Sequence, residues 1–263
     1  MVLMLVFGTG FGWLAHQVER ARAQQKAAAG IEKLGGQVEV EYVSGGLTGT
    51  AVAWLGKLFD EDLTGDVTVV HLGRTRVSNA DLTYLQGLTQ LQTLDLDHTA
   101  VTDLGLLHLR GLSELQELTL RGTKVTDTGL AQLQGLIHLE GLNLFDTHVT
   151  DAGLQYLRRL TRLRRLDLCG TQVTDAGLVH LRGLRCLESL SLRGTSTTSD
   201  GLVHLRELTG LRYLNLANTQ VTDVGLEHLR GLPELNKLWL TQTQVTDAGV
   251  NGLQKALPNV KID

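Results

Sequence analysis

The chain has 263 residues and a formal net charge of −4, so it lacks the strong positive field that favours nucleic acid or an anionic membrane surface. Hydrophobic residues make up 42% of the sequence but aromatic residues only 4%, which predicts an aliphatic core dominated by leucine. The two cysteines, Cys169 and Cys186, are too few for a disulfide framework, and we expect no bond between them.

Residues 1–15 form the first distinct segment, which is apolar apart from Thr9. A membrane-spanning helix needs about 17–25 such residues, so the run is slightly short. It also lacks the basic start and the small-residue cleavage site of a signal peptide. We interpret it as an apolar anchor or signal-like segment that attaches the protein to a membrane, on a side that the sequence leaves open. The alternative is a capping helix or a mobile tail on a soluble protein.

Residues 16–35 are rich in Ala, Gln, Lys and Arg and predict a polar helix or stalk that ends at Gly35-Gly36. Residues 37–42 alternate like a strand, and residues 51–58 are typical of a short helix. We assign residues 36–66 to an N-terminal cap that shields the repetitive region after it.

A 24-residue repeat fills residues 67–258, which hold eight units. Six units carry Val-Thr-Asp, beginning at Val101, Val125, Val149, Val173, Val221 and Val245. The other two carry the degenerate copies Val77-Ser78-Asn79 and Thr197-Thr198-Ser199. A phase kept over this length predicts that every repeat forms the same structural unit and that the units stack along the chain.

Each unit contains two periodicities. Leu94 and Leu96 alternate as in a strand with one buried face, whereas Leu106, Leu109 and Leu112 recur every three residues, as in a tight helix. Asp103 and its equivalents are always Asp, Asn or Ser, which predicts that they cap the helix of their own unit. Glycine follows two residues later in most units, where we expect neighbouring chains to crowd.

Stacking the units buries the leucines that one unit cannot bury alone. Strands pack about 4.8 Å apart, whereas helices need roughly 8–10 Å, so the stack must curve with the strands inside. The sequence therefore predicts an α/β solenoid, with a curved parallel sheet on the concave side and short helices on the convex side. Residues 259–263 are expected to add an end strand.

A column of threonines occupies the same position in all eight units, where the chain turns inward after the strand. An unpaired backbone group costs about 1–3 kcal/mol there, and a hydroxyl can satisfy one. We therefore predict a structural ladder formed by Thr75, Thr99, Thr123, Thr147, Thr171, Thr195, Thr219 and Thr243.

These residues resemble the leucine-rich-repeat superfamily, whose units normally place Asn or Cys where this chain has Thr. The Val-Thr-Asp-x-Gly-Leu run is most similar to bacterial membrane-linked repeat proteins and to the cysteine-containing repeats of F-box proteins. The resemblance covers about three quarters of the chain and implies protein binding. No F-box or ubiquitin-ligase segment is visible, so no such activity is carried over.

The positions that face out of the concave sheet vary from unit to unit, while the leucines do not. Exposed Trp, Tyr, Phe and Arg dominate binding hot spots, so we expect a partner-binding surface there. Its candidate residues are Arg121, Phe145, Arg165, Arg193, Tyr213 and Trp239. Tyr213 and Trp239 should meet diagonally across adjacent strands, with Arg165 roughly 10 Å away in the Tyr213 row.

Two columns on the helical side have weaker functional interpretations. One column holds the histidines His108, His180, His204 and His228, and we interpret it as a solvated flank rather than a metal site. The other holds the arginines Arg110, Arg158, Arg182, Arg206 and Arg230. These either bind an acidic partner or phosphates, or pair with nearby acids and cover aliphatic surface with their stems. On the concave side, His71, Asp95, Asp97 and His98 cluster, but we predict no metal there.

The sequence contains no phosphate-binding glycine loop, zinc-spaced cysteines or nucleophile elbow. We therefore expect no enzyme activity and no cofactor. The expected partner is a protein, with membrane contact through the N-terminal segment and neither nucleic acid nor a small-molecule substrate. The leading hypothesis is a membrane-anchored, protein-binding scaffold; the alternative is a structural or self-associating envelope component.

Overall fold

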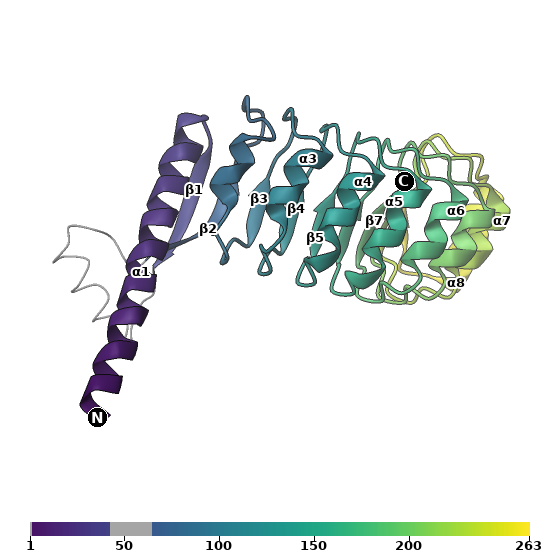
Figure 1. Ribbon diagram of the computed structural model, residues 1–263. Coiled ribbons are helices and arrows are strands. Elements are labelled where there is room, and N and C mark those ends of the chain that lie inside the picture. The colour runs from purple at the N-terminus through teal and green to yellow at the C-terminus, as the bar shows by residue number, and fades with distance from the viewer. Residues whose placement is uncertain (1, 43–64) are drawn as a thin grey trace.

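The structure, a computed structural model, describes residues 2–42 and 65–263. The helix predicted at residues 51–58 and most of the predicted cap at residues 36–66 lie outside the described residues. Helix α1 (Val2–Lys33) is followed by the antiparallel pair β1 (Gln37–Tyr42) and β2 (Gly65–His71). A curved stack of repeated turns begins at β2, with strands along one side and short helices along the other (Figure 1).

One short strand comes from each further turn of the stack. These strands are β3 (Thr93–Asp95), β4 (Glu117–Thr119), β5 (Gly141–Asn143), β6 (Arg165–Asp167), β7 (Ser189–Ser191), β8 (Tyr213–Asn215), β9 (Lys237–Trp239) and β10 (Lys261–Ile262). Together with β1 and β2, they form one ten-stranded sheet within the described residues, in sequence order and parallel from β2 onward. The predicted α/β solenoid fold is confirmed.

The convex side carries the helices that return the chain to the next strand. The α-helices are α3 (Asp103–Leu106), α4 (Asp127–Leu130), α5 (Asp151–Leu154), α6 (Asp175–Leu178), α7 (Asp223–Leu226) and α8 (Asp247–Ala256). The 3₁₀ helices are η1 (Asp81–Leu85), η2 (Leu107–Leu109), η3 (Ala131–Gly135), η4 (Gln155–Arg159), η5 (Val179–Leu181), η6 (Asp200–Leu205) and η7 (Glu227–Leu229). Apart from α8, the helices on the convex side have three to six residues, as the period of three predicted.

The register between units keeps equivalent residues side by side. Leu94 pairs with Leu118 and Leu118 with Leu142, so the strand leucines form an unbroken buried row. The same leucine positions are buried in unit after unit, and they make one continuous aliphatic core. Because neighbouring units bury each other's leucines, the core extends along the stack rather than around a centre.

The second half of α1 packs against the first unit of the stack and does not project as a stalk. Its apolar positions Ala21, Ala27 and Ile31 are buried. Gln24 is also buried, and its Oε1 accepts a hydrogen bond from the backbone N of Val67 at 3.0 Å. Arg20 forms an ion pair with Asp66 at 2.7 Å. The polar composition of residues 16–35 hid an apolar helical stripe that covers the end of the core.

Helix α1 is continuous across the predicted boundary between residues 15 and 16. Within the part of the chain that the structure describes, no helix is long and apolar enough to cross a membrane.

The aspartates of the Val-Thr-Asp run do not cap their own helices, so the predicted N-caps are wrong. Asp103 is the first residue of α3, and the residue before it, Thr102, occupies the N-cap position. The Asp103 carboxylate instead crosses to the next unit, where it accepts hydrogen bonds from Thr126 N at 2.8 Å and Thr126 Oγ1 at 2.6 Å. This bridge recurs at Asp127–Thr150, Asp151–Thr174, Asp175–Thr198 and Asp223–Thr246.

The exceptions to Asp keep this bridge between units. Asn79 and Ser199 accept a hydrogen bond from the backbone N of Thr102 and Thr222 in the same way. The glycine that follows two residues after the Asp position in most units has a steric cause, because a Cβ on Gly129 would lie 2.4 Å from Asp103 Oδ1. Glycine therefore leaves the space that the carboxylate of the preceding unit occupies.

Hydrogen bonding fixes the charge state of the first bridge. Burial alone would raise the pKa of Asp103, but the hydrogen bonds from Thr126 and Thr128 outweigh it and hold the pKa below its usual range. The ionised carboxylate is the better acceptor, so the Asp103–Thr126 bridge joins its two units by charge-assisted hydrogen bonds.

Candidate functional site

The predicted threonine column forms identical local hydrogen bonds in every unit. Each hydroxyl donates to the carbonyl of the leucine three residues earlier, at 2.6–2.9 Å between Oγ1 and O. Thr171 illustrates the geometry: its hydroxyl and its backbone N both donate to Leu168 O, at 2.6 and 3.2 Å. The bonds close within each unit, so the column is a stack of equivalent turns and not a continuous chain.

One unit departs from this pattern in its core. Thr197 stands where most other units have valine, and it is fully buried. Its hydroxyl lies 2.9 Å from Thr195 Oγ1. Since the Thr195 hydroxyl already donates to Leu192 O at 2.7 Å, Thr197 must be the donor in this pair. The threonine column therefore also satisfies a buried polar side chain.

The concave face is built from the outward positions of the strands. In the register of the sheet, Glu117, Gly141, Arg165, Ser189 and Tyr213 occupy successive positions of one row. A second row, two residues further along each strand, holds Thr119, Asn143, Asp167, Ser191, Asn215 and Trp239. The described side chains of both rows are partly or fully exposed, except that Gly141 is covered.

A shallow hollow of about 300 Å³ lies over strands β4 to β7, and both rows line it. Its first feature is an ion pair between Glu117 and Arg165, which sit two strands apart. Gly141 lies between them, and a Cβ there would overlap the Glu117 carboxylate. The missing side chain at Gly141 thus lets the two charges meet across an intervening strand.

The second feature of the hollow is a pair of side chains held by their own backbone. Asn143 Oδ1 accepts from Phe145 N, and Asp167 Oδ1 accepts from Cys169 N, each at 2.9 Å. These bonds fix the side chains against the ends of β5 and β6 while leaving them partly exposed. Asp95 and Asn215 make the same local bond outside the hollow.

The predicted aromatic pair lies at the C-terminal end of the concave face. Tyr213 pairs with Lys237 and Asn215 with Trp239, so the two aromatic residues sit diagonally on adjacent strands. Tyr213 is 45% exposed, one of the more exposed large apolar side chains among the described residues. The Lys237 ammonium lies 5.4 Å from the Trp239 ring centroid and forms an ion pair with Asp263.

The other predicted binding residues are arranged differently from our expectation. Arg165 bonds to Glu117, so it points away from the Tyr213 end that it was expected to join. Arg121 stacks over Phe145, with its guanidinium carbon 4.5 Å from the ring centroid. Arg193 is exposed at the end of β7. The six candidates therefore fall into separate groups along the face rather than into one cluster.

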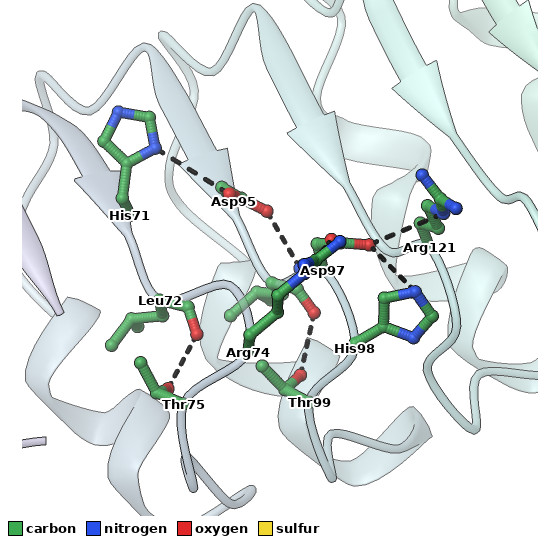
Figure 2. Close-up of polar contacts among 10 residues, drawn as sticks. His71, Leu72, Arg74, Thr75, Asp95, Asp97, His98, Thr99 and Arg121 are labelled. Atoms are coloured by element: carbon green, nitrogen blue, oxygen red, sulfur yellow. Dashed lines mark hydrogen bonds and ion pairs between the residues drawn. The ribbon is translucent and has the colours of Figure 1, made fainter. Parts of the chain in front are cut away.

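The proposed His–Asp cluster near β2 and β3 has the geometry of loose ion pairs (Figure 2). His71 Nδ1 lies 3.8 Å from Asp95 Oδ2, and His98 Nε2 lies 3.8 Å from Asp97 Oδ1. The two histidines lie at opposite ends of the group, and Arg74 and Arg121 face Asp97 between them (Figure 2). Among the residues that the structure describes, no group has the arrangement of a metal site.

The histidine and arginine columns on the helical flank contact each other between units. Arg158 Nη2 lies 2.6 Å from His180 Nδ1, and Arg182 Nε donates to His204 Nδ1 at 3.1 Å. Arg206 and His228 repeat this contact, and Arg110 donates to Gln132 at the equivalent position, 2.8 Å away. The expectation that these arginines pair with acids is wrong except at Arg230, which bonds Glu227.

These contacts have an electrostatic consequence. Partial burial, and then the neighbouring arginine, lower the pKa of His180, His204 and His228. A neutral imidazole can accept a hydrogen bond from the guanidinium, whereas an imidazolium would repel it. The flank is therefore a ladder of contacts between units rather than a row of separate solvated side chains.

The repeat positions place Glu117, Gly141 and Asp167 on the concave face, but sequence reasoning did not select them as binding residues. The signal was present in the spacing, because Glu117, Gly141 and Arg165 follow one another at the repeat length of 24. Reading the rows for opposite charges separated by a glycine would have found the pair. Lys237 and Asp263 lacked such a signal, because the last strand lies outside the repeat.

Comparisons with known proteins agree with this architecture. Residues 209–259 match the family described as Leucine Rich repeats (2 copies), and residues 135–157 match the family described as Leucine Rich repeat. The crystal structure of internalin C2 from Listeria monocytogenes is similar, with a TM-score of 0.60 and 26% sequence identity. The match covers 75% of this chain and 81% of that chain. No curated protein has a sequence that matches this one.

The curved parallel sheet, the buried leucine rows and these matches define a solenoid protein whose units stack in one direction. The chain has the leucine-rich-repeat fold, and two segments of it match leucine-rich-repeat families.

Proposed function

We propose that this protein is a non-catalytic scaffold that binds another protein on the concave face of its sheet. The observation that carries the proposal is the contrast between the two faces of each strand. Leu142, Leu166 and Leu214 are buried in the shared core. The outward residues beside them vary along the sheet and, apart from the covered Gly141, are partly or fully exposed, so they are free to meet a partner without loss of core packing.

Tyr213 and Trp239 are the proposed anchors of this surface. Aromatic side chains bring a large apolar area at a low cost in conformational entropy, and they dominate measured hot spots. The pairing of β8 with β9 places the two residues on neighbouring strands, so one segment of a partner can cover both. Lys237 lies over the Trp239 ring at the edge of the same surface, where its ammonium pairs with Asp263.

Site-specific photocrosslinking tests the location of the binding surface. The full chain is produced with p-benzoylphenylalanine in place of Tyr213 and irradiated in an extract of the source cells. A matched variant carries the same group at Val224, which is 67% exposed on the convex side. We expect a crosslinked protein from the Tyr213 position that is absent from the Val224 position.

A second pair of variants asks whether the anchors contribute affinity. Changing Tyr213 and Trp239 to alanine should abolish recovery of the crosslinked partner by the unmodified chain. Changing Arg182 and Arg206 on the helical flank should leave recovery unchanged. Crosslinks from Val224 alone, or loss of the partner only in the arginine variant, would place the surface on the convex side. Crosslinks only to further copies of this chain would favour a self-associating envelope component.

We also propose that the protein attaches to a membrane through the apolar residues 1–15. The buried positions Ala21, Ala27 and Ile31 limit how the test is designed, because removing them would uncover the core. The full chain is therefore compared with a chain that lacks only residues 1–15. The proposal requires the full chain to sediment with membranes and the shortened chain to remain in the supernatant. Identical distribution of both chains would contradict it.

A further inference from the structure

The hollow over β4 to β7 carries an unbalanced negative charge. Its charged lining residues are Glu117, Arg165 and Asp167. Glu117 and Arg165 are bound to each other, so their charges are mutually satisfied. Asp167 uses Oδ1 for the bond from Cys169 N, and its Oδ2 has no hydrogen-bond or ion-pair partner among the described residues. One carboxylate oxygen therefore faces the hollow without a counter-charge.

The residues beside Asp167 add further acceptors for a hydrogen-bond donor. Asn143 and Ser191 flank Asp167 on the neighbouring strands, in the same row. Strands lie about 4.8 Å apart, so a single donor group between two of these side chains can reach both at hydrogen-bond distance. The amide oxygen of Asn143 is already oriented by its bond from Phe145 N, which leaves its second lone pair available.

The arrangement is ordered before any ligand arrives. The local bonds of Asn143 and Asp167 hold both side chains on the short strands of a rigid sheet. The Glu117 carboxylate occupies the space beside Gly141 that a side chain would fill, and its bond to Arg165 holds it there. Side chains that are fixed in the free protein lose little entropy on binding, so more of the interaction appears as affinity.

We propose that this hollow receives the cationic side chain, lysine or arginine, of the partner protein's bound segment. The inference rests on the proposed function, because it assumes a protein segment on the concave face. Charge complementarity selects the occupant: the free carboxylate oxygen attracts a cation, and the flanking oxygens accept the remaining N–H donors of an ammonium or guanidinium. An acidic side chain finds its natural partner, Arg165, already occupied by Glu117.

A random peptide library displayed on phage is the probe for this inference. It is selected in parallel against the immobilised full chain, against Asp167→Asn and against Asp95→Asn. Asparagine preserves the local turn in both variants, since Asn143 and Asn215 make the same backbone bond naturally. Asp95 occupies the equivalent position outside the hollow, so its variant removes an equal charge from the same row. Thermal melting checks that both variants remain folded.

We expect peptides selected on the unchanged chain to share one lysine or arginine. A synthetic peptide with this residue should bind the unchanged chain and Asp95→Asn equally, and Asp167→Asn at least about tenfold more weakly, the usual scale for a charge-assisted hydrogen bond. Replacing the shared lysine by norleucine should weaken binding to the unchanged chain by a similar factor. The same replacement should have little further effect on Asp167→Asn, because the two groups interact directly.

Selected peptides without a shared basic residue, or with a shared acidic one, overturn the inference. Equal loss of affinity in Asp167→Asn and Asp95→Asn also overturns it, because the attraction would then be general. Binding of the selected peptides to the variant with Tyr213 and Trp239 changed to alanine shows separately whether they use the concave surface. If the peptides lose affinity for this variant but share no basic residue, the proposed concave binding surface is supported and the proposed cationic anchor is refuted.

Discussion

The threonine column offers a direct measurement of how much one repeated hydrogen bond stabilises the solenoid. Replacing Thr171 by valine keeps the shape of the side chain and removes its hydroxyl. A buried carbonyl without any donor would cost about 1–3 kcal/mol. Leu168 O, however, keeps its second donor, the backbone N of Thr171 at 3.2 Å. The cost should therefore be near that of one net hydrogen bond, about 1 kcal/mol.

Chemical denaturation of Thr171→Val measures this cost, with Thr161→Val as the control. Thr161 is exposed in the turn between η4 and β6, so its change should alter the free energy of unfolding by less than about 0.5 kcal/mol. A loss of about 1 kcal/mol should also lower the melting temperature by roughly 2–4 °C in a domain of this size. Equal denaturant midpoints for the two variants would refute the reasoning that the buried hydroxyl contributes to stability.

Three further predictions concern other contacts of the repeat. Thr195→Val should cost about 1–3 kcal/mol more than Thr171→Val, because it leaves the buried Thr197 hydroxyl without a partner; adding Thr197→Val should recover the difference in the same urea titration. Gly153→Ala places a Cβ 2.4 Å from Asp127 Oδ1 and should destabilise by about 1–3 kcal/mol, whereas Gly135→Ala, with no atom within 4 Å of its Cβ, should be nearly neutral in thermal melts. The lowered folded-state pKa values of His180, His204 and His228 mean that the unfolded chain binds more protons, so their contribution is present above about pH 6.5 and is lost as the pH falls. The urea midpoint should decrease when the pH is lowered from 7.5 to 5.5. The decrease should be smaller when all three histidines are changed to glutamine, the residue that accepts from Arg110 at this position. The same pH dependence in both proteins would contradict the ladder.

The sequence was sufficient to predict the structural features that occur at a fixed position in every unit. The alternation of Leu94 and Leu96 and the period of three from Leu106 fix a strand and a tight helix, because each depends only on residues a few positions apart. The phase of Val-Thr-Asp then sets the order of units and the parallel sheet. The position of the threonines inside each turn is likewise local, since each hydroxyl reaches back only three residues.

The side-chain contacts between neighbouring units could not be predicted from the sequence pattern. The partner of Asp103 is Thr126, and the partner of Arg158 is His180, so each pair depends on how one unit rests on the next. The N-cap prediction failed because α3 begins one residue early: Thr102 occupies the N-cap position, and the Asp103 carboxylate reaches the amide of Thr126 in the following unit. Only the stacking of the units brings that amide within reach.

Two features required the full tertiary structure. The side of α1 that covers the core is visible only once Ala21, Gln24 and Ile31 lie against β2 and the first unit, since Ala and Gln on the buried side do not stand out in a sequence rich in Ala, Gln, Lys and Arg. The Glu117–Arg165 pair joins residues 48 positions apart, across a glycine on the strand between them. Sequence alone thus determined which residues form the core and which are left to face outward. The stacking of units decided which outward side chains meet, because that depends on register and on the space that each neighbour leaves.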